Sequence, residues 1–288
     1  MPDIHPLAAV DPQATLADDV KIGPFCHVGP KVTLGAGTRL VSNATIVGRT
    51  TMGENNIVWP GAVLGGDPQD LKFQGEDSRL TIGSHNEFRE CATIHKGTAN
   101  DHGITKVGDH NLIMAYAHLG HDCVVGNHCI IANTVQLAGH VLIEDHVVIG
   151  GGSAVHHFVT LGQHAFIGGF TRVLQDPPPF MVTEGSPSAV RGVNSTGLTR
   201  RGFSPESIAH LKDAWKRLYR RRGQKGQAGS TTAALESLED AYPHDASVQA
   251  LIAHIRRANG GVFGRYREGL RRDDPRARRP RTAGQQSG

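Results

Sequence analysis

Apolar side chains recur at every sixth position along most of the first 173 residues. Three series carry this period, over residues 4–64, 82–94 and 107–173. The first two series consist of Ile4, Val10, Leu16, Ile22, Val28, Leu34, Leu40, Ile46, Met52, Val58, Leu64 and of Ile82, Phe88, Ile94. Six residues are too few for a helix pair or a hairpin, but they fit one short strand and one bend, with the apolar side chain pointing inward. The period therefore predicts a stack of short strands.

Three such units make a triangular coil of about 18 residues, and coils stack at roughly 4.8 Å through hydrogen bonds between their strands. The three series together provide about nine coils. Because a single coil cannot bury its own apolar ladder, the stack must be long. Glycine often follows the apolar residue, as at Gly23, Gly108 and Gly150, and suits tight bends. We therefore predict a mainly β protein in which residues 1–190 form a parallel β-helix of hexapeptide repeats.

Two stretches interrupt the period and predict loops that leave the coil. Between Leu64 and Ile82 the spacing is kept, but Asp70 and Glu76 stand at positions that should be apolar. The step from Ile94 to Val107 is one residue longer than two repeats. We expect loops at 65–81 and 95–106, and loops on a rigid scaffold are where binding sites are usually built.

The repeat stops near residue 177, and the pattern after it is helical. Ser204 followed by Pro205 and Glu206 is typical of a helix N-terminus, with a capping side chain, a proline in the first turn and an acid. Apolar residues at helical spacing follow, and further helices are expected at 231–242 and 247–259. We therefore predict a helical domain over 191–262 and a disordered basic tail over 263–288.

Composition and charge exclude several classes of protein. The chain has 288 residues and a formal net charge of only +3, which does not indicate a nucleic-acid-binding surface. None of the four cysteines forms a C-x-x-C pair, and no apolar stretch is long enough to be a signal peptide or to span a membrane. These features predict a soluble protein of the cytoplasm, with no transmembrane segment.

The 17 histidines are not spread evenly, and the repeat predicts how several of them are arranged. His121, Gly139 and His157 each come two positions after an apolar repeat residue, and successive members are one coil apart. They should therefore form one column along an edge of the prism. The neighbouring columns should hold His118, His140 and His156.

Five motifs extend this pattern. They are Asp67-Pro68-Gln69-Asp70-Leu71-Lys72, Ile94-His95-Lys96-Gly97-Thr98, Ala117-His118-Leu119-Gly120-His121-Asp122, Leu137-Ala138-Gly139-His140 and Asn194-Ser195-Thr196-Gly197-Leu198-Thr199-Arg200-Arg201-Gly202-Phe203. In order and spacing they resemble the UDP-N-acetylglucosamine 3-O-acyltransferases of lipid A synthesis, over residues 1 to about 260. The resemblance implies a left-handed helix and a homotrimer. It also implies an acyl-carrier protein as acyl donor, a UDP-sugar as acceptor, and direct transfer without a cofactor or a metal ion.

The same resemblance assigns roles to individual residues. His121 matches the general base that takes a proton from the sugar 3-hydroxyl, Asp122 the carboxylate that orients it, and Gly139 the residue whose N–H binds the oxyanion. The positions that match substrate contacts are Asp70, Lys72, His118, His140, His156, Asn194, Arg200 and Arg201. Gly169 matches the residue that limits the depth of the acyl chain. An imidazole suits the base because an unperturbed pKa of about 6.5 leaves it largely neutral near pH 7.

The chain departs from the family pattern at two of these places. His157, also expected to contact substrate, stands where the family usually has glutamine, and Thr196 stands where it has glutamate. These changes leave open an acceptor with a 3-amino group. Three different functions compete with O-acyl transfer: the related N-acyltransferase, a non-catalytic hexapeptide scaffold, and a zinc hydratase with three histidine ligands. The N-acyltransferases carry an extra domain before the repeats, whereas the repeats here begin at Ile4.

Overall fold

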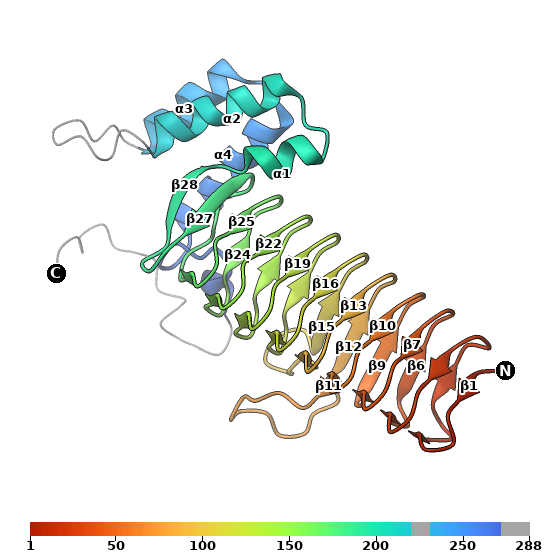
Figure 1. Ribbon diagram of the computed structural model, residues 1–288. Coiled ribbons are helices and arrows are strands. Elements are labelled where there is room, and N and C mark those ends of the chain that lie inside the picture. Colours follow the sequence, from red (N-terminus) through yellow and green to blue (C-terminus); the bar gives the residue numbers. More distant parts are fainter. Residues whose placement is uncertain (220–230, 272–288) are drawn as a thin grey trace.

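The computed structural model describes residues 1–219 and 231–271, and it is a left-handed parallel β-helix capped by helices (Figure 1). The prediction from the six-residue period is therefore confirmed. Each coil contributes one short strand to each of three sheets, and strands one coil apart pair in parallel. Among the paired strands of the described residues, only the last pair, β27 with β28, is antiparallel.

The first sheet has eleven strands. They are β1 (Asp3–Ile4), β4 (Lys21–Ile22), β7 (Arg39–Leu40), β10 (Ile57–Val58), β13 (Glu87–Phe88), β16 (Leu112–Ile113), β19 (Ile130–Ile131), β22 (Val148–Ile149), β25 (Phe166–Ile167), β27 (Met181–Glu184) and β28 (Ala189–Val193). The second sheet has nine strands. They are β2 (Ala9–Val10), β5 (His27–Val28), β8 (Thr45–Ile46), β11 (Val63–Gly66), β14 (Thr93–His95), β17 (His118–Leu119), β20 (Gln136–Leu137), β23 (Ala154–Val155) and β26 (Arg172–Val173).

The third sheet has eight strands. They are β3 (Thr15–Leu16), β6 (Val32–Leu34), β9 (Arg49–Met52), β12 (Arg79–Ile82), β15 (Ile104–Val107), β18 (Val124–Val125), β21 (Leu142–Ile143) and β24 (Thr160–Leu161). The repeat residues of all three sheets point into one core that runs the length of the prism, and Val58, Ile113 and Leu161 are completely buried. This continuous ladder is what stabilises the stack.

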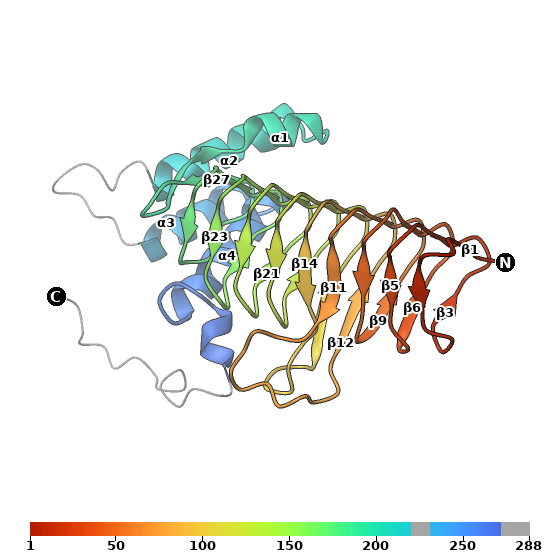
Figure 2. The ribbon, with the colours of Figure 1, turned by 60° about the horizontal axis from the view of Figure 1, so that its bottom comes forward.

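Both predicted loops leave the prism at the bends that lead from the second sheet to the third. One insertion occupies 67–78, between β11 and β12, and the other occupies 96–103, between β14 and β15. The strands on either side stay in register, because Val63 pairs with Thr93, which in turn pairs with His118. Figure 2 shows both insertions projecting from the same edge of the prism.

Four helices form a second core beyond the last strands (Figure 1). They are α1 (Ser195–Arg200), α2 (Pro205–Leu218), α3 (Thr231–Ala241) and α4 (Ala246–Gly260). Ser204 caps α2 by accepting a hydrogen bond from the Ser207 N–H, as the sequence predicts. The sequence pattern missed α1 and the β27–β28 hairpin, since neither follows the six-residue period.

The structure differs from the expected tail at its beginning. Residues 263–271 are not a loose extension: they lie against the β-helix and include the 3-10 helix η2 (Arg267–Leu270). The hydrogen bonds that anchor this segment come from arginine side chains and backbone groups. The composition of the segment shows only that it is basic and polar, so it does not indicate these contacts. The rest of the expected tail, 272–288, lies outside the described residues.

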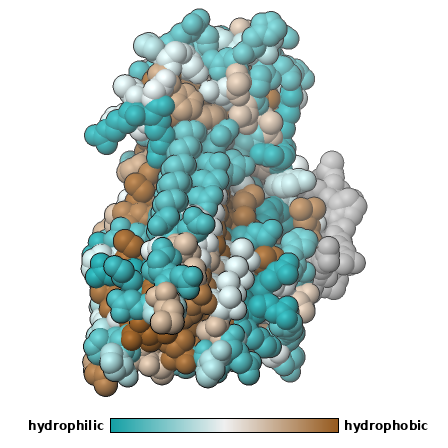
Figure 3. Space-filling model, turned by 90° about the vertical axis from the view of Figure 1, so that its right-hand side faces the viewer, coloured by the Kyte–Doolittle hydropathy of each residue, from teal (hydrophilic) through white to brown (hydrophobic). Residues whose placement is uncertain are grey.

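The face of the molecule seen in Figure 3 mixes hydrophilic and apolar side chains, and apolar ones gather toward the N-terminal end of the prism. Ile4 and Leu7 of the first coil are 40% and 58% exposed. Within residues 1–219 and 231–271, none of the helices combines the length and the apolar character that crossing a bilayer requires.

Candidate active site

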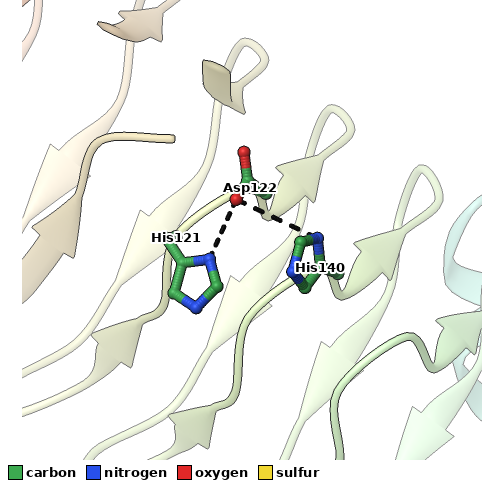
Figure 4. A group of neighbouring side chains, drawn as sticks. All are labelled: His121, Asp122 and His140. Atoms are coloured by element: carbon green, nitrogen blue, oxygen red, sulfur yellow. Dashed lines mark hydrogen bonds and ion pairs between the residues drawn. The ribbon is translucent and has the colours of Figure 1, made fainter. Parts of the chain in front are cut away.

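His121 and Asp122 form a hydrogen-bonded pair at the bend that follows β17. The His121 Nδ1 lies 2.9 Å from a carboxylate oxygen of Asp122 (Figure 4). Asp122 is 2% exposed, and its backbone adopts a positive φ of 59° at this bend. With Nδ1 engaged, Nε2 is the nitrogen of His121 that can exchange a proton with a substrate.

The 96–103 insertion holds the Asp122 carboxylate in place. The Thr98 N–H donates to both carboxylate oxygens, at 2.9 and 3.1 Å, and the Thr98 hydroxyl donates to one of them at 2.7 Å. Thr98 is completely buried. These donors hold the carboxylate in one orientation, and the carboxylate in turn fixes the tautomer and orientation of His121. Thr98 is the last residue of one of the five sequence motifs, but no pattern in the sequence indicated its contact with Asp122.

His140 lies one coil beyond His121 and is oriented by a second carboxylate. Its Nδ1 is 2.9 Å from Asp101, and its ring meets that of His121 edge to face, with centroids 4.9 Å apart. Burial opposes ionisation of Asp101, but the hydrogen bond and charge of His140 prevail and lower the pKa of this carboxyl. Asp101 is another residue of the 96–103 insertion that sequence reasoning missed.

Gly139 lies directly against the His121 ring. A Cβ at position 139 would come within 2.6 Å of the His121 Cε1 and Nε2 atoms, so only glycine leaves the imidazole in its place. The His140 N–H donates to the His121 carbonyl, and the Phe158 N–H donates to the Gly139 carbonyl. These bonds confirm the predicted column of residues 121, 139 and 157.

Two further imidazoles lie on the other side of the base. His118 Nδ1 is 2.8 Å from the Thr93 hydroxyl, and the rings of His95 and His118 meet edge to face. Burial lowers the pKa of His95 to about 4, with smaller contributions from His118 and His121, and burial also lowers the pKa of His118. Both side chains are therefore neutral near pH 7 and add no positive charge beside His121.

A cleft of about 400 Å³ opens beside this group. It gathers six of the residues singled out by sequence: Asp70, Lys72, His121, Gly139, His140 and His157. The 67–78 insertion forms one wall, and the Lys96 ammonium ties it to the second insertion through an ion pair with Asp67 at 2.9 Å. The cleft also contains Phe158 and Arg271, which no sequence pattern indicated.

His156 and His157 lie side by side next to the cleft. Their ring centroids are 3.8 Å apart, and the His157 Nε2 is 3.8 Å from a carboxylate oxygen of Glu268. Burial, followed by the neighbouring His156, lowers the pKa of His157 to about 4. His157 therefore presents a neutral imidazole near pH 7, which can donate and accept hydrogen bonds much as a glutamine does.

Four of the predicted residues lie away from this cleft. Asn194 is 8% exposed and caps α1, with its side chain bonded to the Gly197 N–H and the His164 carbonyl. Arg200 is exposed in the last turn of the same helix, and Arg201 caps its end. Gly169 follows β25, at the bend that leads from the first sheet to the second. Within one chain, the predicted site residues thus lie on different edges of the prism.

Arg201 marks a separate edge of the prism. It acts electrostatically on His146 and His164, whose pKa values are lowered, first of all by burial. These two rings end a column of stacked imidazoles at the bend between the third sheet and the first. The column consists of His85, His110, His128, His146 and His164, with neighbouring ring centroids 4.6–4.9 Å apart.

Two groups of side chains near the cleft have the spacing of metal ligands. They are His121, Asp122, His140 and His156, His157, Glu268, and the ligand atoms in each lie within 4.8 Å of one another. In the first group, Asp122 is already hydrogen-bonded to Thr98, and His140 is hydrogen-bonded to Asp101. In the second, the positive charges of Arg265 and Arg271, both paired with Glu268, oppose a cation. Hydrogen bonding therefore accounts for the first group, and the neighbouring arginines make the second a poor site for a cation.

Comparisons with known proteins agree on one family. Residues 176–263 match the model of the second domain of UDP-N-acetylglucosamine O-acyltransferases, and residues 13–48 and 104–139 match that of the bacterial transferase hexapeptide repeats. Among solved structures, the UDP-N-acetylglucosamine acyltransferase of Francisella novicida has a TM-score of 0.82 and 39% identity, covering 88% of this chain and 91% of its own. The enzyme of Campylobacter jejuni has a TM-score of 0.81 and 34% identity, covering 88% of this chain and 96% of its own.

Curated relatives match over nearly their whole length. The acyl-[acyl-carrier-protein]–UDP-N-acetylglucosamine O-acyltransferase of Verminephrobacter eiseniae is 44% identical over 252 residues, which are 88% of this chain and 95% of that protein. The protein of the same name from Thiobacillus denitrificans is 44% identical over 263 residues, 91% of this chain and all of that protein. The chain is an acyltransferase and belongs to the acyl-[acyl-carrier-protein]–UDP-N-acetylglucosamine O-acyltransferase family.

Proposed function

We propose that this enzyme transfers a 3-hydroxy fatty acyl chain from an acyl-carrier protein to the 3-hydroxyl of UDP-N-acetylglucosamine, the first step of lipid A synthesis. The observation that carries the proposal is the group formed by His121, Asp122 and Gly139, in which an oriented imidazole faces a glycine one coil away. Such a pair supplies both a base and a backbone donor for acyl transfer, without a protein nucleophile.

In the proposed reaction, the Nε2 of His121 takes the proton of the sugar 3-hydroxyl as its oxygen attacks the thioester carbon. The negative charge that develops on the carbonyl oxygen is stabilised by the N–H of Gly139. When the C–S bond breaks, the imidazolium returns the proton to the departing sulfur. Asp122 stabilises the imidazolium between these steps, and its hydrogen bonds from Thr98 hold it in place beside His121.

We further propose that the enzyme works as a homotrimer in the cytoplasm. Asn194, Arg200 and Gly169 lie away from the edge that carries His121, so contact between parallel prisms would bring these residues and the base to one cleft. There Asn194, Arg200 and Arg201 would bind the nucleotide, and Gly169 would limit the depth of the acyl chain. The four cysteines, all free in the structure, suit a reducing compartment.

The test is a transfer assay with radiolabelled UDP-N-acetylglucosamine and acyl-carrier proteins that carry chains of several lengths, each with and without a 3-hydroxyl. We expect an O-acylated UDP-sugar and a preference for the 3-hydroxy chains. The 3-amino analogue of the acceptor is assayed in parallel, because His157 and Thr196 depart from the family pattern. Transfer to the amino sugar alone, or to neither acceptor, would contradict the proposed function.

A further inference from the structure

The segment 262–271 follows α4 and returns to the edge of the prism that carries the catalytic pair (Figure 2). Asp176 fixes its start, since the Asp176 N–H donates to the Gly264 carbonyl and the Asp176 carboxylate accepts from the Tyr266 N–H at 2.8 Å. The buried Arg265 guanidinium donates to the Leu174 carbonyl at 2.7 Å. The path of this segment is therefore determined by the last coil of the β-helix.

The segment next contacts the residues that surround the base. The Arg267 guanidinium donates to the carbonyl of His140 and lies 3.9 Å from the Asp101 carboxylate. Since Asp101 orients His140, Arg267 links the segment to the hydrogen bonds of the site. The following residues, in η2, bring Glu268 next to His157.

Arg271 completes the segment and lines the cleft itself. Its guanidinium lies over the Phe158 ring, 5.4 Å from the ring centroid, and its Nη1 is 3.4 Å from a carboxylate oxygen of Glu268. Phe158 in turn stacks on His140, with centroids 4.3 Å apart. Phe158 belongs to the second coil after the one that carries the base, roughly 10 Å along the prism, and Arg271 shares the cleft with Lys72.

We propose that Arg271 is a substrate-binding residue of the cleft and that it binds a phosphate group of one of the two substrates. The inference rests on the proposed function and deepens it. A planar guanidinium has five N–H donors and can bind a carboxylate and a phosphate at once. Stacking on Phe158 and the ion pair with Glu268 orient the guanidinium in the cleft, which reduces the entropy lost on binding.

Both substrates of the proposed reaction carry phosphate groups. The sugar nucleotide has a diphosphate next to the sugar, and the acyl donor has a phosphodiester at the far end of its phosphopantetheine arm. The match to the family's second domain ends at residue 263, so it does not include Arg271. The binding chemistry is the same in both cases, and kinetics can separate the two sources.

The test compares Arg271→Gln with the wild-type full-length protein. We expect KM for one substrate to rise about ten- to a hundred-fold, the loss typical of a charge-assisted hydrogen bond, while kcat changes little. Arg271→Lys keeps the charge but not the planar fork and should recover only part of the loss. Arg256→Gln is the matched control, because Arg256 is also paired with a carboxylate but lies exposed on α4. It should leave both KM values unchanged.

Two additional measurements identify the source of the phosphate. If Arg271 binds the diphosphate, calorimetry should show weaker binding of UDP to Arg271→Gln than to the wild type. If it binds the acyl-donor arm, the wild type should prefer acyl-phosphopantetheine to acyl-pantetheine, and the variant should lose that preference. Unchanged KM values for both substrates in a folded, active variant would overturn this inference alone, whereas an inactive wild type would overturn the proposed function.

Discussion

The orientation of His121 depends on two other side chains, Asp122 and Thr98, which belong to different parts of the chain. His121 and Asp122 come from the regular coil, whereas Thr98, which bonds the carboxylate, comes from an insertion. The repeat thus places the base, and the insertion secures its partner. Substitutions at single residues can separate these contributions.

His121→Ala should lower turnover by roughly 10²–10⁴-fold, because it removes the proposed general base. The side chain is on the outside of the coil, so the thermal unfolding midpoint should stay near that of the wild type. His85→Ala, which removes another imidazole at a bend of the prism but away from the cleft, is the matched control. Near-normal turnover in His121→Ala would contradict the mechanism.

Gly139→Ala should lower kcat by about a hundred-fold, because it displaces the proposed general base while keeping the backbone N–H at position 139. The added Cβ would lie 2.6 Å from His121, so the imidazole must move away from its place beside the glycine. Gly29→Ala is the control, since a Cβ there meets its nearest atom only at 3.6 Å. Steady-state kinetics of the two variants should differ clearly, and equal kcat values would show that the contact is unimportant.

At the residue scale, the repeat predicted how its own side chains stack, and the motifs singled out Asp70 and Lys72 in the first insertion, which line the cleft. The contacts of Thr98 and Arg271 were missed. The positions of His121, Gly139 and His157 follow from the repeat, because residues one coil apart must stack. Thr98 and Arg271 lie in segments without a period, and their contacts depend on how those segments fold back on the prism. No local pattern encodes such a path.

Among the elements, α4 carries a buried histidine that links stability to pH. Burial lowers the pKa of His254 to about 4, with a smaller contribution from Arg257, and its Nε2 has no partner among the described residues. Between pH 6.5 and 4 the unfolded chain therefore binds a proton at this position and the folded chain does not. Stability must fall as the pH drops through this range.

His254→Leu should weaken this pH dependence, by roughly 1–3 kcal/mol in the unfolding free energy between pH 7 and pH 4. Urea unfolding followed by circular dichroism at the two pH values measures the difference. His244→Leu, at an exposed position before α4, is the control and should behave like the wild type. The same fall in stability for His254→Leu and the wild type would show that His254 is not responsible.

The elements also show where sequence patterns are informative. Short strands with a strict period were predictable because every coil repeats the same inward position. Helix α2 was predictable from the cap at Ser204 and its apolar face. The short helix α1 carries no such signal, since it has only six residues and a single buried side chain, Leu198.

On the scale of the whole molecule, the predicted site residues lie on separate edges of one prism. If a neighbouring subunit completes the cleft, inactive subunits that carry different substitutions should restore activity when they assemble together. His121→Ala and Arg200→Ala subunits, refolded together in equal amounts, should regain about a quarter of wild-type activity, the fraction of clefts that receive both intact residues. Each variant refolded alone provides the baseline, and a mixture no more active than this baseline would contradict a shared cleft.

The distance between His121 and Gly139 is set by the hydrogen bond from the His140 N–H to the His121 carbonyl, at 2.9 Å. This bond is one rung of the ladder that joins every coil to the next, so neither residue can move apart from the other unless the coils separate. In enzymes whose catalytic groups sit on mobile loops, heat abolishes activity before it melts the fold. Here the spacing between the base and the oxyanion donor should persist on warming until the β-helix itself unfolds, so activity lost at a lower temperature would have to come from the 67–78 and 96–103 insertions.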